Sequence, residues 1–114
     1  MNEIDHLKKL AQLDLNLLVI LKAIEDHRHV TKTARSLGIS QSAVSHALGR
    51  LRQTFGDDLY VKTPRGMVPT PRASALKDRV QNLIQDLGEV FFSMPIWMFQ
   101  PAALDQLLDK HLTA

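Results

Sequence analysis

The apolar residues near the start of the chain follow a helical pattern. Asp14 is a typical helix N-cap and precedes an apolar run, which predicts a helix from Leu15 to about His27. A short helix that is apolar over most of its circumference has to be covered on both sides. We expect one side to contact the core of the same domain. The other side carries Leu15, Leu18 and Val19, and we expect it to contact a second subunit.

Two further helices are predicted in the next part of the chain. Thr31 is expected to cap a second, short helix that ends near Leu37, where Gly38 supplies the left-handed residue that stops it. Ser40 is expected to cap a third helix over residues 41–55, whose apolar residues recur at the spacing of a buried face. The short connection between these helices predicts a tight corner.

The residues around this corner have the spacing of a helix-turn-helix. Ala34 allows the two helices to approach closely, Gly38 takes the turn, and Val44 holds the third helix on the second. Such spacing also occurs by chance in helical proteins. Here it is followed by two short strand candidates, residues 59–62 and 67–68, which are joined by a Pro- and Gly-containing bend. A hairpin in this place predicts a wing, so the expected fold is mainly α, a winged helix-turn-helix with three core helices and a two-stranded β wing.

A long linker helix is predicted after the wing. Thr70 and Pro71 have the pattern of an N-cap and first helical residue, and the helix should extend to about Phe92. Its apolar residues alternate in steps of four and three, as in a dimerising seam: Leu76, Val80, Leu83, Leu87 and Val90. The alternative is an ordinary amphipathic helix packed on its own domain. The expected organisation is a DNA-binding domain over 1–70, a linker helix over 71–93 and a tail over 94–114.

The exposed side of the third helix carries the candidate base contacts. With the apolar positions turned inward, Gln41, Ser42, Ser45, His46 and Arg50 face outward. The Gln41 amide can pair with an adenine edge and the His46 ring with a guanine acceptor, whereas Arg50 lies a turn later, at the height of a phosphate. Gly49, also on this side, would permit close approach of the DNA backbone. Neutral drift explains the glycine equally well.

Four further residues are candidate contacts to the phosphate backbone or the minor groove. Thr31 and Lys32 lie where the free N–H groups of a helix N-terminus attract a phosphate, although capping alone accounts for Thr31. Lys62 and Arg65 flank the bend of the hairpin and could reach an adjacent minor groove. The alternative is that these wing charges are simply solvated.

Charge and composition support this picture and exclude several others. The net charge is only +2, yet residues 28–79 contain ten Lys or Arg against three Asp, between acidic flanks. The chain has no cysteine, no apolar run that would span a membrane and no basic-then-apolar secretion signal, so we expect a cytoplasmic, nucleoid-associated protein. We find no phosphate-binding glycine loop, catalytic triad or metal-ligand spacing, and we therefore expect no enzyme activity, cofactor or metal.

Three stretches carry a family likeness: the run Leu15-Asn16-Leu17-Leu18, the segment VTKTARSLGISQSAVSHALGRLR and the segment GDDLYVKTPRGMVPTPRA. On these, residues 15–92 resemble the DNA-binding domain and linker helix of LysR-type transcriptional regulators, and the wing most resembles the branch that contains nodulation and leucine-operon-linked regulators. The resemblance implies a homodimer built through the linker helices, with a higher oligomer as a further option, that binds double-stranded DNA. Ser42 stands where the family usually has proline, Thr33 where it has alanine, and His46 where arginine is frequent. The last departure puts the identity of one base contact in doubt.

The resemblance also concerns the length of the chain. LysR-type regulators continue into a periplasmic-binding-protein-like effector domain, and this sequence ends soon after the expected entrance to it. We therefore expect a truncated or naturally short form without a small-molecule effector. The competing function is a winged helix that contacts another protein instead of DNA.

Overall fold

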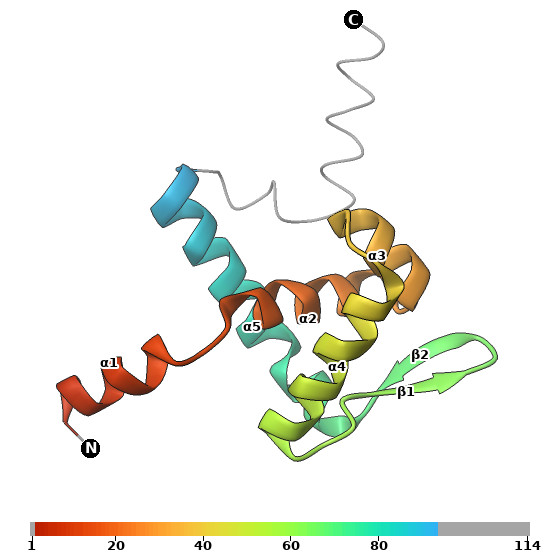
Figure 1. The fold of residues 1–114 in the computed structure, drawn as a ribbon, viewed down its shortest axis with the longest axis horizontal. Coiled ribbons are helices and arrows are strands. Elements are labelled where there is room, and N and C mark those ends of the chain that lie inside the picture. The colour runs from red at the N-terminus through yellow and green to blue at the C-terminus, as the bar shows by residue number, and fades with distance from the viewer. Residues whose placement is uncertain (1, 94–114) are drawn as a thin grey trace, which may run out of the picture.

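The computed structural model describes residues 2–93, and the expected tail over 94–114 lies outside them. Within the described residues the chain forms five helices and one two-stranded sheet, in the order shown in Figure 1. The elements are α1 (Glu3–Ala11), α2 (Leu15–His27), α3 (Val30–Leu37), α4 (Gln41–Phe55), β1 (Tyr60–Thr63), β2 (Gly66–Pro69) and α5 (Pro71–Phe92). The predicted winged helix-turn-helix with a long final helix is confirmed.

Helix α2 is the centre of the domain. It begins after the predicted N-cap, whose side chain accepts a hydrogen bond from the Asn16 N–H, and it packs against α3, α4 and α5. Ile24 is fully buried and Leu21 nearly so. On the opposite side Leu15 and Val19 are 55% and 41% exposed, whereas Leu18 packs partly on the core. The helix therefore keeps two apolar faces, of which this chain covers one.

The helix-turn-helix consists of α3 and α4. Gly38 ends α3 in the left-handed conformation with φ +67°, and Ser40 caps α4 by accepting a hydrogen bond from the Ala43 N–H at 3.0 Å. Thr33, which replaces a smaller residue of the family pattern, is fully buried, and its hydroxyl lies 3.5 Å from the Ala23 carbonyl oxygen as a donor. A buried hydroxyl with a partner keeps α2 and α3 in contact without an unsatisfied polar atom.

The predicted N-cap of α3 is wrong by two residues. Helix α3 begins at Val30, and the cap is His29, whose Nδ1 accepts a hydrogen bond from the Lys32 N–H at 3.4 Å. The reason is the preceding residue, because Arg28 has φ +53° and ends α2 in the left-handed conformation. Only Arg28 and His29 then separate the two helices, and Thr31 lies inside the first turn of α3.

The wing begins and ends one residue away from the expected positions. The antiparallel register pairs Tyr60 with Pro69 and Thr63 with Gly66, so Leu59 belongs to the preceding turn. Leu59 has φ +60° and is fully buried. The Asp57 carboxylate fixes this turn by accepting hydrogen bonds from the Leu59 N–H and the Thr70 hydroxyl, both at 2.7 Å. The Asp57 side chain thus connects the turn before β1 to the N-cap of α5.

The apolar seam of α5 divides into two halves. The helix begins at the predicted Thr70 cap with Pro71 in its first turn. Leu76 packs against the core and Val80 is only 8% exposed, so the first half packs on its own domain. Further along, Leu83 and Val90 are 50% and 77% exposed, and Figure 1 shows this end of α5 leaving the domain. The description as an ordinary amphipathic helix therefore holds for the first half.

Helix α1 has no counterpart among the predicted elements. Its cap is Asn2, whose side chain accepts a hydrogen bond from the Asp5 N–H at 2.9 Å, and it has acidic residues in its first turn and lysines in its last. Both features favour a helix. None of its residues is buried, and Figure 1 shows it extending away from the other helices.

Candidate nucleic-acid interface

Helix α4 presents a polar, exposed face. Val44, Leu48 and Leu51 are buried. The helical period therefore places Ser42, His46 and Gly49 on the opposite, exposed side. These side chains are short or carry hydrogen-bonding atoms, which is what reading base edges in a major groove requires.

A groove runs from one flank of α4 to the wing. It has a volume of about 660 Å³ and is lined by residues of α3, α4 and both strands of the wing, together with the N-cap of α3. Its polar lining residues include His29, Thr31, Gln41, Ser45, Lys62 and Thr63. We call this the reading groove. It brings together four of the predicted contact residues, from Thr31 in α3 to Lys62 in β1. Gln41 and Ser45 lie on the flank of α4 next to its exposed face, so this face and the reading groove adjoin each other.

Arg50 lies on the other flank of α4, away from the reading groove. Its Nη1 is 3.2 Å from Oδ2 of Asp14, the N-cap of α2. Both side chains are partly exposed, so this pair adds little to stability. The predicted phosphate contact thus starts from a guanidinium that already has an acidic partner, and a phosphate would have to compete with a solvated carboxylate.

The two wing cations occupy different places. Lys62 pairs with Met67 in the register and so shares its side of the hairpin, the side that lines the reading groove. Arg65 lies in the exposed turn, where its N–H donates to the Thr63 hydroxyl oxygen at 3.2 Å. That hydroxyl in turn donates to the Gly66 carbonyl at 2.7 Å. Lys62 faces the recognition helix, whereas Arg65 is at the tip.

The position of the wing is set by contact with the end of α2. The Met67 N–H donates to the Arg28 carbonyl oxygen at 2.8 Å. Gly66 approaches the same oxygen so closely that a Cβ on this residue would lie 2.9 Å from it, and its φ is +112°. Any side chain at position 66 would push the hairpin away from the body, so a glycine is required here.

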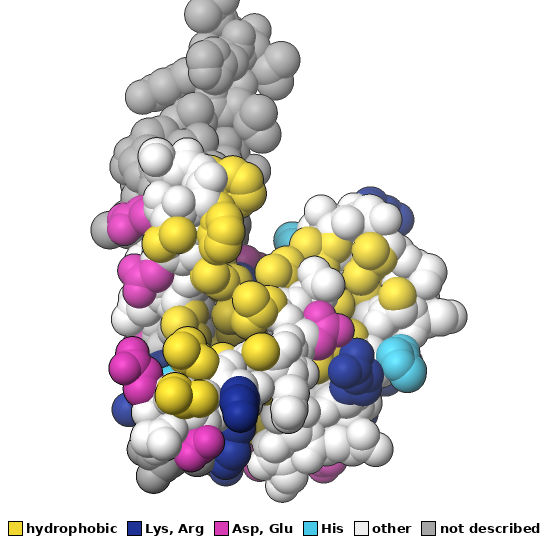
Figure 2. Space-filling model, turned by 60° about the vertical axis from the view of Figure 1, so that its left-hand side comes forward, with side chains coloured by type: hydrophobic (Ala, Val, Ile, Leu, Met, Phe, Trp, Pro, Cys, Tyr) yellow, Lys and Arg dark blue, Asp and Glu magenta, His cyan; other side chains and the backbone are white. Residues whose placement is uncertain are grey.

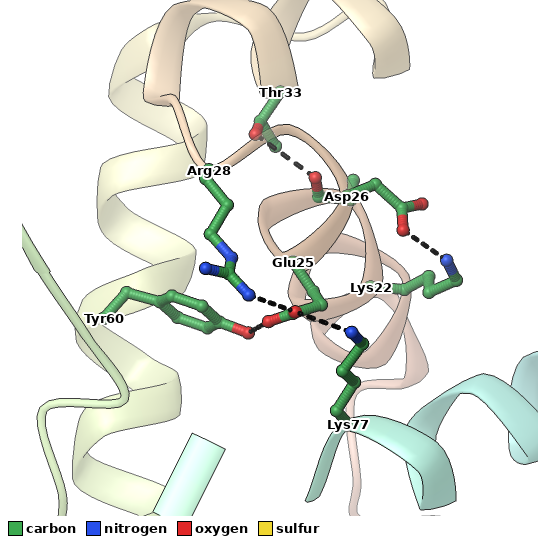
Figure 3. Close-up of polar contacts among 8 residues, drawn as sticks. Lys22, Glu25, Asp26, Arg28, Thr33, Tyr60 and Lys77 are labelled. Atoms are coloured by element: carbon green, nitrogen blue, oxygen red, sulfur yellow. Dashed lines mark hydrogen bonds and ion pairs between the residues drawn. The ribbon is translucent and has the colours of Figure 1, made fainter. Parts of the chain in front are cut away.

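A cluster of four side chains completes this contact (Figure 3). The Glu25 carboxylate accepts hydrogen bonds from the Tyr60 hydroxyl of β1 and, at 2.7 Å, from Nη2 of Arg28. Nζ of Lys77 from α5 is 3.8 Å from the same carboxylate, whose side chain is only 10% exposed. We call Glu25, Arg28, Tyr60 and Lys77 the Glu25 cluster. Burial, and the hydrogen bond to Glu25, raise the pKa of the Tyr60 hydroxyl, which therefore stays protonated as a donor.

Arg52 supports the wing from the side of α4. Its Nε donates to the Asp58 carbonyl at 2.9 Å and its Nη2 to the Tyr60 carbonyl at 2.7 Å. Neither Arg52 nor the Glu25 cluster was among the predicted functional residues. Glu25 and Tyr60 are 35 positions apart, so no local sequence signal connects them. The tyrosine at the start of a short strand was the one available sign, because a buried Tyr hydroxyl needs a partner.

Gly49 is unobstructed on the exposed face of α4. A Cβ at this position would meet nothing within 4 Å, and the residue has ordinary helical geometry. The fold therefore does not require a glycine here, unlike at Gly66.

Residues 2–93 offer neither a metal-binding cluster nor a membrane-spanning helix. No group of three or more potential metal-ligating side chains comes together in this part of the chain. No helix in the described range is long and apolar enough to cross a membrane. 

Comparison with known proteins agrees with the predicted resemblance. The family model for bacterial regulatory helix-turn-helix proteins of the lysR family matches residues 15–74. The transcriptional regulator SyrM of Rhizobium etli is 42% identical over 80% of this chain and 27% of its own length. Nodulation protein D 2 of Sinorhizobium fredii is 49% identical over 78% of this chain and 28% of its own length. The chain thus spans less than a third of these relatives.

Solved structures show the same architecture. A probable transcriptional regulator of Pseudomonas aeruginosa, PA0477, matches with a TM-score of 0.67 and 48% identity over 70% of this chain and 27% of that protein. The BenM_DBD/catB site 1 DNA complex matches with a TM-score of 0.65 and 22% identity over 68% of this chain and 88% of that chain, which supports the fold. Together with the family match over the helix-turn-helix and wing, these likenesses establish that the chain belongs to the LysR family of bacterial regulatory helix-turn-helix proteins.

Proposed function

We propose that this chain is the operator-binding part of a transcription regulator and binds double-stranded DNA with α4 in the major groove. The observation that carries the proposal is that the exposed α4 face adjoins the reading groove, which brings Thr31, Gln41, Ser45 and Lys62 together. A convex helix face flanked by a cationic hairpin fits a duplex, whose major groove admits one helix. A domain of the same fold has been solved in complex with DNA, which is in keeping with duplex binding.

The placement of the side chains suggests a division of roles. Gln41, Ser42, Ser45 and His46 would contact base edges from the first half of α4. Thr31 and Lys32, in the first turn of α3, would bind a phosphate through the helix N-terminus. Lys62 and Arg65 would contact the backbone or minor groove beside the major-groove site, and Arg50 would exchange Asp14 for a phosphate.

A homodimer is part of the proposal. The contact with a second copy would come from two helices. The residues would be Leu83, Leu87 and Val90 at the free end of α5, and Leu15, Leu18 and Val19 of α2. Leu76 and Val80 would act indirectly, by holding α5 on the body. Two copies would place two recognition helices on the half-sites of one operator. We further propose that the protein acts in the cytoplasm on the nucleoid and catalyses no reaction, in keeping with relatives named as regulators.

Duplex binding at several salt concentrations tests the DNA-binding proposal. Each phosphate contact should contribute a slope of about −0.9 in log K against log salt. Replacing Gln41 or His46 with alanine should reduce discrimination between sequences, whereas replacing Lys32 should weaken all duplexes alike. Absence of duplex binding at low salt would overturn the proposal and favour a winged helix that contacts protein.

A further inference from the structure

Asp14 uses its two carboxylate oxygens for different contacts. Oδ1 accepts a hydrogen bond from the Asn16 N–H at 3.0 Å and so caps α2. Oδ2 accepts a hydrogen bond from Nη1 of Arg50 in α4 at 3.2 Å. A cap needs one acceptor oxygen and no charge, because asparagine and serine serve at N-caps as well as aspartate does. The negative charge of Asp14 is therefore not required to begin α2.

The pair of Arg50 with Asp14 also lies beside the proposed base contacts. The two side chains are 48% and 34% exposed, and an ion pair so open to solvent stabilises a fold only weakly. Arg50 follows the exposed His46 by one helical turn, about 6 Å further along the axis of α4. The carboxylate thus lies where the phosphates that flank a major-groove site would approach.

A carboxylate at this place is an exception among the proposed cationic contacts. Lys32, Lys62 and Arg65 form no ion pair within residues 2–93, whereas Arg50 has Asp14 as its partner. On the face drawn in Figure 2, acidic side chains lie mostly along the column below the grey chain end, and few lie to the right of it, where basic and histidine side chains are exposed. The charge of Asp14 therefore acts on Arg50 itself.

We propose that Asp14 competes with DNA for Arg50 and thereby lowers the affinity of this chain for every duplex. This inference rests on the proposed DNA binding and adds to it a residue that sets the affinity. A phosphate that binds Arg50 has to displace Asp14 from the guanidinium. The gain from the new contact is offset by the loss of the old one, and the carboxylate is left unpaired near the phosphates.

The same exchange changes how binding depends on salt. A phosphate neutralised by a free cation releases counterions and contributes about −0.9 to the slope of log K against log salt. At Arg50 this release is balanced, because the carboxylate of Asp14, once it has lost the guanidinium, attracts a cation from solution. The Arg50 contact therefore adds little to the slope while Asp14 is charged, and adds its full share when that charge is removed.

Asp14→Asn tests the competition in the full chain, because asparagine keeps the cap and the shape but not the charge. Duplex titration at several salt concentrations should show binding about two- to fivefold tighter, alike for unrelated sequences, and a slope steeper by up to about 0.9. The matched control is Asp26→Asn, which removes a carboxylate from the same helix and frees Lys22, a residue outside the proposed contacts. It changes the net charge equally and should leave affinity and slope nearly unchanged.

Arg50→Gln distinguishes competition from direct repulsion of DNA by the carboxylate. In a chain that already carries Arg50→Gln, Asp14→Asn should tighten binding less than in the chain with Arg50, because no ion pair is left to break. An equal gain in both backgrounds would show that Asp14 acts by its own charge and would overturn the inference. Weaker binding by Asp14→Asn would also overturn it, since Asp14 would then orient Arg50 toward the phosphate.

Two further measurements separate this inference from the proposed function and from folding. If the unmodified chain binds no duplex at low salt, the proposed function itself fails. If the chain binds DNA and Asp14→Asn has the same affinity and salt slope as the unmodified chain, only the competition by Asp14 is overturned. Circular dichroism checks that Asp14→Asn keeps its helices. Should it not, Asp14→Ser takes its place, because serine also caps a helix but carries no charge.

Discussion

The junction between wing and body and the far end of α5 are constructed in opposite ways. At the junction, Glu25 joins α2, β1 and α5 through a partly buried polar cluster, and the Arg28 carbonyl accepts a hydrogen bond from the second strand. At the far end of α5, apolar side chains such as Leu83 and Val90 are exposed. Contacts within a single chain therefore fix the position of the wing beside α4, whereas the apolar side chains at the end of α5 remain exposed to solvent.

The largest expected effect separates the two halves of α5. Val80→Asp would bury an unpaired carboxylate in the core and should destabilise the domain by more than about 3 kcal/mol. The matched variant Leu83→Asp, one helical turn further on, should change monomer stability little, because Leu83 is 50% exposed. Chemical denaturation followed by circular dichroism checks both. Equal destabilisation by the two substitutions would show that Leu83 contributes to the core as much as Val80 does.

The Glu25 cluster should account for the next largest effect. Glu25→Ala leaves the Tyr60 hydroxyl and the Arg28 guanidinium without their shared acceptor, and should cost about 2–3 kcal/mol. Tyr60→Phe removes one donor and should cost about 1 kcal/mol. Thermal unfolding measures these losses, and a substitution of exposed Glu3 is the control. If Glu25→Ala unfolds like the control, the cluster does not hold the wing.

A smaller effect of opposite sign is expected at Gly49. Gly49→Ala should stabilise the free domain by about 0.5–1 kcal/mol, because alanine favours the helix and the new Cβ meets nothing. If DNA approaches α4 closely, the same substitution should weaken duplex binding. Comparing thermal unfolding with duplex titration separates the two effects. Unchanged or improved DNA affinity would mean that the glycine serves no contact.

The smallest effect concerns acid stability at the entrance to the wing. The hydrogen bond from Thr70, and then that from the Leu59 N–H, lower the pKa of Asp57 below its ordinary value of 3.8. A folded-state pKa below the unfolded one gives stability that is present above about pH 3.8 and is lost as the pH falls through the folded value. Unfolding between pH 5 and about pH 2 should therefore vary less steeply for Asp57→Ala than for the unmodified chain. Identical slopes would contradict this role.

The elements with local signals were predictable, and those that depend on distant contacts were not. Helices α2, α4 and α5 begin after the predicted caps Asp14, Ser40 and Thr70, because capping involves only the next few residues. The cap of α3 was misplaced, since the left-handed Arg28 starts that helix earlier than Thr31 would. The position of a residue within its own helix was easier to predict than the residue of another element that it contacts.

The candidate site shows the same division. The outward direction of Ser42, Ser45 and His46 follows from the helical period and was confirmed by their exposure. The pairing of Arg50 with Asp14 joins residues 36 positions apart, and no periodicity reveals it. The apolar repeat of α5 lies on a helix as predicted, but the repeat does not show that Leu76 and Val80 are covered by the same chain. Helix α1 was missed because its short apolar stripe has no core of its own.

The long sequence separation within the Glu25 cluster has a consequence for the order of folding. Helices α2 to α4 are joined by very short connections, and their contacts can form early, because closing short loops costs little entropy. The Tyr60–Glu25 hydrogen bond closes a loop of 35 residues. We therefore expect the wing to dock last and to open first, and its amide hydrogens to exchange faster than those of α2 while the helical core remains intact.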